Sequence, residues 1–186
     1  MRIVLDTNIL VRANPRVLPQ SLARELLLTA VSQPNQLILS PPILIEVRRV
    51  LTYPHVHSRW PLTMEAIGQY LGYLEAAGIL VEVSASVPAV VSDPDDDPIV
   101  QTAIAGRADV LCTRDAAFRH TAVERFCSAH GIRILDDITL MQELRLHAVL
   151  PFASRLLPPS CSVRICRRAG QISGRPGRPG KTTPRP

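Results

Sequence analysis

The chain has 186 residues, of which 46% are hydrophobic and 4% aromatic, with a formal net charge of +5. The hydrophobic share is enough for a sizeable aliphatic core, and the lack of any run of about 18 apolar residues argues against a membrane span. The first residues do not resemble a signal peptide, and the four cysteines form no close pair, so we expect a cytoplasmic protein with reduced thiols.

Strand and helix signals alternate along most of the chain. In chain order we predict a strand at 3–5, a helix at 21–31, a strand at 37–39, helices at 43–52 and 64–77, a strand at 79–83, a helix at 98–106, a strand at 109–112, a helix at 123–130, a strand at 132–135 and a helix at 138–147. Alternation of this kind predicts an α/β fold with a parallel sheet that helices cover on both faces.

The composition changes near residue 150. Residues 1–150 carry a charge of −3, whereas residues 151–186 carry +8 and hold 7 of the 17 prolines and 4 of the 9 glycines. We therefore predict one domain over 1–148 and an Arg/Pro/Gly-rich tail over 149–186. Such a tail buries too little apolar area to offset its ordering entropy, so we expect it to be mostly disordered. Its charge should add sequence-independent affinity for phosphates.

Four acidic residues stand near the ends of predicted strands. Asp6 and Asp115 follow the strands at 3–5 and 109–112, Glu46 lies early in the helix after the second strand, and Asp96 lies just before another helix. Because the carboxyl ends of parallel strands share one edge of the sheet, we expect these acids to meet there.

Each of these acids also has a purely structural interpretation. Asp6 and Asp115 could cap the segments that follow them, and Glu46 could lie on an outward helix face. Asp97 precedes a proline and is a natural helix cap. The neighbouring polar residues, which would either form turns or orient the acids or a metal-bound water, are Thr7, Asn8 and Thr113.

A cluster of acids without basic partners needs a cation to neutralise it, because like charges about 4 Å apart repel by about 1 kcal/mol even in water. Oxygen ligands without His or Cys suit Mg²⁺ or Mn²⁺. An ion held in this way can polarise a phosphate and activate water. The sequence contains neither a glycine-rich phosphate loop nor a G-x-S-x-G elbow.

The acidic segments resemble the PIN-domain family, especially its toxin branch, over about residues 1–145. The resemblance rests on four motifs in order: Ile-Val-Leu-Asp-Thr-Asn-Ile-Leu at 3–10, Glu46 in its apolar helix, Asp-Pro-Asp-Asp-Asp-Pro-Ile-Val-Gln-Thr-Ala at 93–103, and Ala-Asp-Val-Leu-Cys-Thr-Arg-Asp at 108–115. Arg114 departs from the family, which commonly has a small residue there, and the tail has no counterpart.

The resemblance implies a three-layer α/β/α sandwich that acts as a metal-dependent endoribonuclease with Mg²⁺ or Mn²⁺. It implies four catalytic acids, of which all but Glu46 bind metal: Asp6, Glu46, Asp96 and Asp115. It implies three supporting residues: Asn8, Thr113 and Asp97. Aligning the helix on Ile99 and Ala103 selects Asp96 as the ligand, and a one-residue slip would exchange it with Asp97.

The toxin branch further implies the toxin of a type II toxin–antitoxin module, with RNA as substrate and an antitoxin as partner. An alternative is a catalytically inactive or regulatory RNA-binding module of the same fold. A phosphotransferase with Asp6 as nucleophile would require an acid at position 8, where the chain has Asn8. An apolar face over 64–77 is compatible with a homodimer.

Overall fold

The computed structural model describes residues 1–83 and 97–156, with side chains described up to residue 147. Its centre is a sheet of five parallel strands in the order β3-β2-β1-β4-β5. The strands are β1 (Arg2–Leu5), β2 (Gln36–Leu39), β3 (Ile79–Leu80), β4 (Val110–Cys112) and β5 (Arg133–Leu135). All five predicted strands are present, and β3 is shorter than the predicted 79–83.

Eight α-helices and one 3₁₀ helix are present among the described residues. They are α1 (Thr7–Ala13), α2 (Leu22–Ala30), α3 (Pro41–Leu51), α4 (Pro54–Arg59), α5 (Met64–Ala77), α6 (Asp97–Ala105), η1 (Ala116–Arg119), α7 (Thr121–Ala129) and α8 (Asp137–Leu156). The six predicted helices are all found, whereas α1 and α4 were not predicted. Helix α1 follows β1 after one residue, and α4 begins at a proline that the sequence pattern indicated only as the end of α3.

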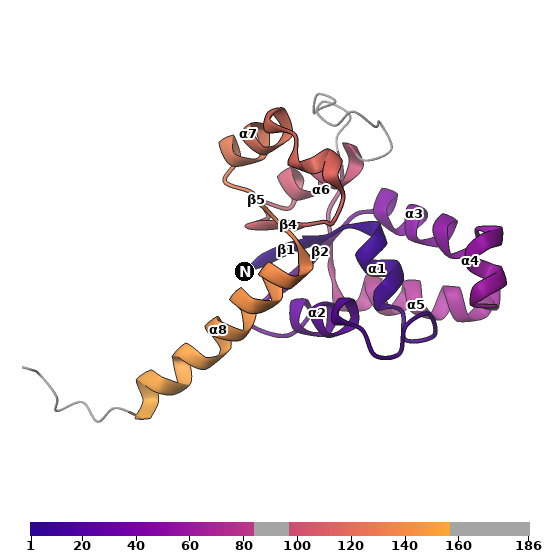
Figure 1. Cartoon of the computed structure of the whole chain (residues 1–186), viewed down its shortest axis with the longest axis horizontal. Coiled ribbons are helices and arrows are strands. Elements are labelled where there is room, and N and C mark those ends of the chain that lie inside the picture. Colours follow the sequence, from indigo (N-terminus) through magenta and orange to yellow (C-terminus); the bar gives the residue numbers. More distant parts are fainter. Residues whose placement is uncertain (84–96, 157–186) are drawn as a thin grey trace, which may run out of the picture.

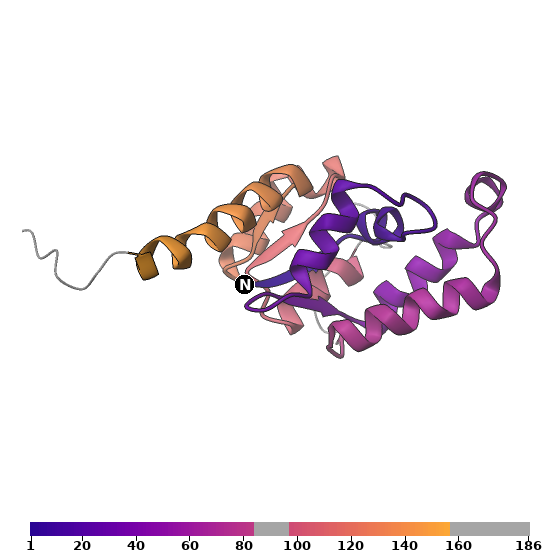
Figure 2. The ribbon, with the colours of Figure 1, turned by 90° about the horizontal axis from the view of Figure 1, so that it is seen from below.

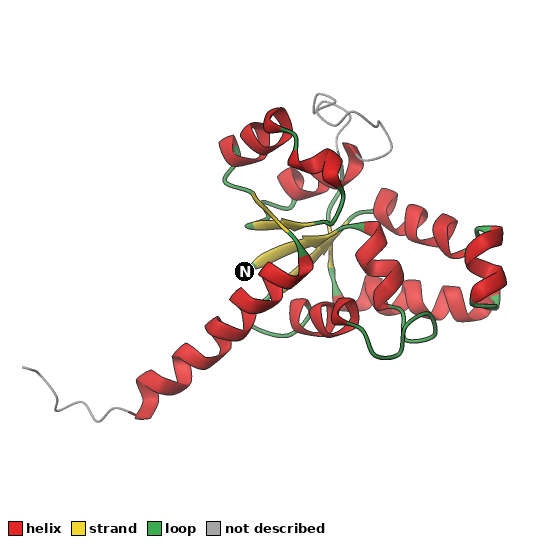
Figure 3. Cartoon of the chain, viewed as in Figure 1, coloured by secondary structure: helices red, strands yellow, loops and turns green. Residues whose placement is uncertain are grey.

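Helices cover both faces of the sheet, so the predicted three-layer α/β/α sandwich is confirmed (Figure 3). Figure 1 shows α6 and α7 on one side of the sheet and α2 and α8 on the other. Helix α8 extends from one end of the molecule, and α3, α4 and α5 extend from the opposite end (Figure 2). No described helix is long and apolar enough to cross a membrane.

The central strands are completely buried, which explains their continuous apolar sequences. Ile3, Val4 and Leu5 of β1 have no exposed surface, and the same is true of β4. Strands that are covered on both faces have this pattern, in place of the alternation of a half-exposed sheet. The core is therefore aliphatic, as its composition predicts, and it fixes the carboxyl ends of β1 and β4 rigidly.

Two predictions fall wholly or partly outside the described residues. Asp96 and the neighbouring acids of the 93–97 segment, except Asp97, belong to the range 84–96. Most of the predicted tail lies in 157–186. Helix α8 itself continues to Leu156 and so crosses the domain boundary that we predicted at residue 148.

Candidate active site

The strand order places the sheet's switch point between β1 and β4. From β1 the chain moves outward to β2 and β3, then returns to β4 and β5 on the other side. Ligands bind to sheets of this type in the crevice at the carboxyl ends of such strands. The register pairs Leu5 with Cys112, so the residues that follow, Asp6 and Thr113, lie side by side at this edge.

Asp6 connects the central strand to the first helix. Its backbone N–H donates to the carbonyl oxygen of Cys112 (2.9 Å) and continues the β1–β4 ladder. Its side chain caps α1 by accepting a hydrogen bond from the N–H of Asn8 (3.3 Å). Only 3% of Asp6 is exposed. The cap that we considered as an alternative is therefore present, and it holds a carboxylate at the switch point.

Thr113 links the two acids that the sequence placed at strand ends. Its buried hydroxyl donates to Asp6 Oδ2 (2.7 Å) and accepts from the backbone N–H of Asp115 (3.0 Å). Asp115 is exposed and caps η1 by accepting from the N–H of Ala117 (2.8 Å). Thr113 thus fixes the position of Asp6 and of the loop that carries Asp115.

The electrostatic environment of Asp6 disfavours its negative charge. Burial raises the pKa of the Asp6 carboxyl above its ordinary value, and the nearby Asp115 raises it further. Hydrogen bonds from Thr113 and Asn8 lower this pKa and only partly offset the burial. A cation bound beside Asp6 would relieve both the desolvation and the repulsion.

Glu46 lies in a neighbouring recess of about 180 Å³ that is formed by α1, α3 and α6. Its carboxylate pairs with Arg49 one turn later (2.6 Å), which is the partner that its apolar surroundings require. Thr7, the residue after Asp6, lines the same recess, and its buried hydroxyl has no hydrogen-bond partner among the described residues. The recess therefore joins Glu46 to the Asp6 end of α1.

The start of α6 lies at this recess. Pro98 and Ile99 line it, and Asp97, the first residue of the helix, is 7% exposed. A buried hydrogen bond between the hydroxyls of Ser40 and Thr102 (2.6 Å) ties α6 to the end of β2. Asp97 therefore lies directly before the residues of α6 that line the recess. Asp96 is outside the described residues, so the choice between the two remains a prediction.

Sequence reasoning missed two further acids, Asp136 and Asp137. They follow β5, and the register of β4 with β5 places Asp136 beside Thr113. Asp137 is 3% exposed and accepts a hydrogen bond from Arg114 Nε (2.6 Å). Arg114 thus pairs with an acid of this chain, a partner that the sequence did not predict. The signal was available, because these acids follow a strand as Asp6 does.

The donor set at this edge fits a hard divalent cation in its chemistry. Every candidate ligand is a carboxylate or hydroxyl oxygen, Asp6 carries an unfavourable buried charge, and the Thr7 hydroxyl has no partner in the described part of the chain. Within the described residues, however, no three acidic, histidine or cysteine side chains are close enough to hold an ion by themselves. The predicted third ligand, Asp96, lies outside that part of the chain.

Comparison with known proteins identifies the family. The family model of the PIN domain matches residues 2–117, which is more than half of the chain. No curated protein matches the sequence. A solved structure described as VapBC2 from Rickettsia felis bound to a DNA fragment from their promoter is similar at 16% identity and a TM-score of 0.48, over 73% of this chain and 98% of that chain. That similarity is too low to add to the assignment, which rests on the family match and the motifs along 2–117: this chain belongs to the PIN-domain family.

Proposed function

We propose that this chain is a metal-dependent endoribonuclease that hydrolyses RNA phosphodiester bonds at the edge formed by β1 and β4. The observation that supports this best is Asp6, a buried carboxylate with a raised pKa that Thr113 orients at the switch point of the sheet. Domains of the PIN family are generally nucleases. A buried acid without a cation partner among the described residues is costly for a purely structural role.

The proposed ligands are Asp6, Asp115 and Asp96, with Glu46 completing the shell or positioning water. Thr113 and the backbone of Asn8 hold the Asp6 carboxylate in one orientation. A bound Mg²⁺ or Mn²⁺ supplies Lewis acidity, which polarises the phosphate and lowers the pKa of a bound water. Asp97 supports the start of α6.

The biological role that we propose is the toxin of a type II toxin–antitoxin module, acting on RNA in the cytoplasm and inhibited by an antitoxin. This role derives from the toxin branch that the motifs resemble. A homodimer also remains a prediction; Met64 at the start of α5 is exposed and available for such a contact.

The decisive experiment is a cleavage assay on single-stranded RNA with the purified full chain. We expect cleavage with Mg²⁺ or Mn²⁺, none with EDTA, and none for Asp6→Asn. Glu124→Gln, which changes an exposed acid on α7, should cleave like the parent protein. Cleavage that persists in EDTA, or an active Asp6→Asn variant, would refute the metal mechanism.

An inactive RNA-binding module is the second candidate. The observation in its favour is that the described acids do not by themselves form a three-ligand group. This module would bind RNA and leave it intact at every Mg²⁺ and Mn²⁺ concentration, which the same assay distinguishes from the endoribonuclease.

A further inference from the structure

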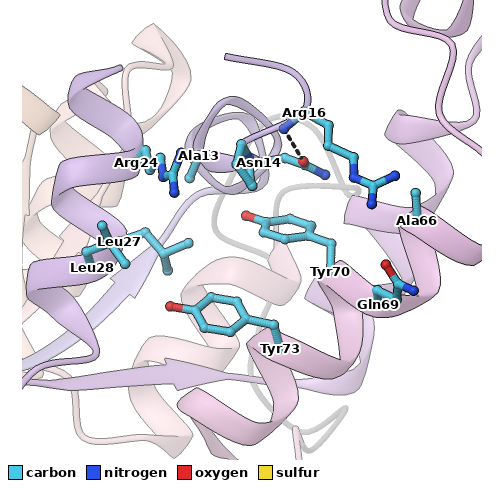
Figure 4. Close-up of a pocket in the computed structure, with 11 residues that line it drawn as sticks. Ala13, Asn14, Arg16, Arg24, Leu27, Leu28, Ala66, Gln69, Tyr70 and Tyr73 are labelled. Carbon is cyan, nitrogen blue, oxygen red and sulfur yellow. Dashed lines mark hydrogen bonds between the residues drawn. The ribbon is translucent and has the colours of Figure 1, made fainter. Parts of the chain in front are cut away.

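A second cavity lies at the far end of α1, between α1, α2 and α5 (Figure 4). Its volume is about 320 Å³, which is the size of a small-molecule site. The polar and aromatic residues that line it are Asn14, Arg16, Arg24, Gln69, Tyr70 and Tyr73. No acidic side chain is among its described lining residues. The cavity is therefore basic, in contrast to the acidic edge at the start of the same helix.

Asn14 is the unusual residue of this cavity. It is 2% exposed, and its Oδ1 accepts a hydrogen bond from the backbone N–H of Arg16 (2.9 Å). Its amide nitrogen Nδ2 is buried and has no hydrogen-bond partner among the described residues. A buried donor without a partner has an energetic cost, because it has lost its hydrogen bond to water. An acceptor atom of a ligand in the cavity would remove that cost.

Two arginines, Arg16 and Arg24, line the same cavity as this donor. Figure 4 shows the Asn14 amide and the Arg16 guanidinium extending on the same side of the Tyr70 ring. Arg24 lines the cavity from α2 and uses one nitrogen, Nη1, to donate to the carbonyl of Pro19 (3.0 Å). Amide and guanidinium groups that line one cavity without a described acid fit an anionic group, and a phosphate accepts such bonds on several oxygens.

The remaining surface is aromatic and apolar. The rings of Tyr70 and Tyr73 lie nearly parallel, at 21° with centroids 6.5 Å apart. The Tyr70 hydroxyl donates to the carbonyl of Leu10 (2.6 Å), which fixes that ring, whereas Tyr73 is 40% exposed. A planar base could stack on Tyr73, as bases stack on aromatic side chains in single-strand binding proteins.

We propose that this cavity binds one nucleotide unit, with its phosphate at Asn14, Arg16 and Arg24 and its base on Tyr73. This nucleotide is either free or part of an RNA strand. Binding of an RNA strand rests on the proposed function. Helix α1 has seven residues and spans about 10 Å at 1.5 Å per residue. That length corresponds to about three nucleotides of a stacked strand at about 3.4 Å each.

The test measures nucleotide and RNA binding to the full chain in EDTA, which prevents the proposed metal-dependent cleavage. Isothermal titration with AMP and UMP probes the free nucleotide, and anisotropy of a labelled single-stranded RNA probes the strand. Asn14→Asp keeps the side-chain shape and the acceptor for Arg16, and it replaces the unpaired donor by a negative oxygen. Arg16→Gln and Tyr73→Leu test the charge and the stacking. Arg12→Gln, an exposed arginine on α1 outside the cavity, is the matched control.

We expect Asn14→Asp to weaken nucleotide binding at least tenfold, and Arg16→Gln and Tyr73→Leu to weaken it several-fold. The control Arg12→Gln should leave the binding of AMP and UMP unchanged. Arg16→Gln should also reduce the slope of log affinity against log salt by about 0.7 for a single strand. Since Arg16 and Tyr73 are exposed, those variants will fold even if Asn14→Asp does not.

The outcomes separate the sources. If the cavity variants lose affinity for RNA, with or without a loss for AMP and UMP, the site binds one residue of an RNA strand. If they lose affinity for AMP and UMP alone, the site binds a free nucleotide. Unchanged binding of AMP, UMP and RNA in the Arg16→Gln and Tyr73→Leu variants overturns the proposal. A chain that never cleaves RNA refutes the proposed function and leaves these binding results as they stand.

Discussion

Replacing Asp6 by asparagine should make the metal-free protein more stable while removing its activity. Asparagine caps helices as well as aspartate does, so α1 keeps its start. The substitution removes a buried charge and its repulsion with Asp115. Relief of an unfavourable functional-site residue commonly stabilises a protein by about 0.5–2 kcal/mol. For a chain of this size 1 kcal/mol corresponds to about 2–4 °C in Tm, so we expect a rise of about 1–8 °C.

The extra stability of Asp6→Asn over the parent protein should increase with pH. Because the folded-state pKa of Asp6 is raised, the folded protein retains this proton when the unfolded chain has lost it. The penalty is absent below the ordinary aspartate pKa, grows as the pH rises through the folded-state pKa, and is complete above it. The stability advantage of Asp6→Asn should therefore be greater at pH 7 than near pH 3, where it disappears.

Thermal melts in EDTA at pH 7 and pH 3, repeated with Mg²⁺ at pH 7, provide the measurement. Mg²⁺ should raise the Tm of the parent protein and leave Asp6→Asn unchanged, because a ligand stabilises only the state that binds it. If Asp6→Asn is less stable than the parent protein in EDTA at pH 7, the carboxylate has a stabilising partner and our reasoning about its charge is wrong.

Three further predictions test the surroundings of this site. Thr113→Val keeps the shape and removes the hydroxyl between Asp6 and Asp115; urea denaturation should show a loss of about 1–3 kcal/mol, and cleavage should fall at least tenfold. Arg114→Gln should lower the free energy of unfolding by about 1–2 kcal/mol. This is less than the roughly 3–5 kcal/mol lost when a fully buried ion pair is broken, because the Arg114 side chain is 45% exposed. A double-mutant cycle with Asp137→Asn measures the coupling between the two side chains. Removing residues 157–186, which carry a charge of +7, should weaken RNA binding more at low salt than at high salt; an unchanged salt slope would show that these residues do not contact phosphates.

The sequence predicted the sheet and two of its acids for one physical reason. Continuous apolar runs identify buried strands, and in a parallel sheet the residues after such runs share an edge. Asp6 and Asp115 follow runs of this kind, and the structure places Thr113 between them. Asp136 and Asp137 also follow a strand, but the sequence interpretation assigned the residues after them to a helix and gave the acids no role.

Other features could not be predicted from the local sequence pattern. Helix α1 begins one residue after β1, so no loop separates the two patterns, and Asp6 both ends the strand and caps the helix. The bond between Ser40 and Thr102, which positions α6, joins residues 62 positions apart. Local propensity does not contain this information, because the partner is chosen by the packing of the whole sheet.

The partner of Arg114 bears on which acids can bind metal. Two nearly buried carboxylates, Asp6 and Asp137, lie at the ends of β1 and β5. Asp137 is neutralised by Arg114 at 2.6 Å, whereas Asp6 receives hydrogen bonds and no ion pair among the described residues. A metal ion at Asp137 would have to displace a guanidinium, whereas one at Asp6 would remove an existing repulsion with Asp115. We therefore propose that Asp137 is a structural acid that orients Arg114, and that the cation of the proposed mechanism binds on the Asp6 side of Thr113.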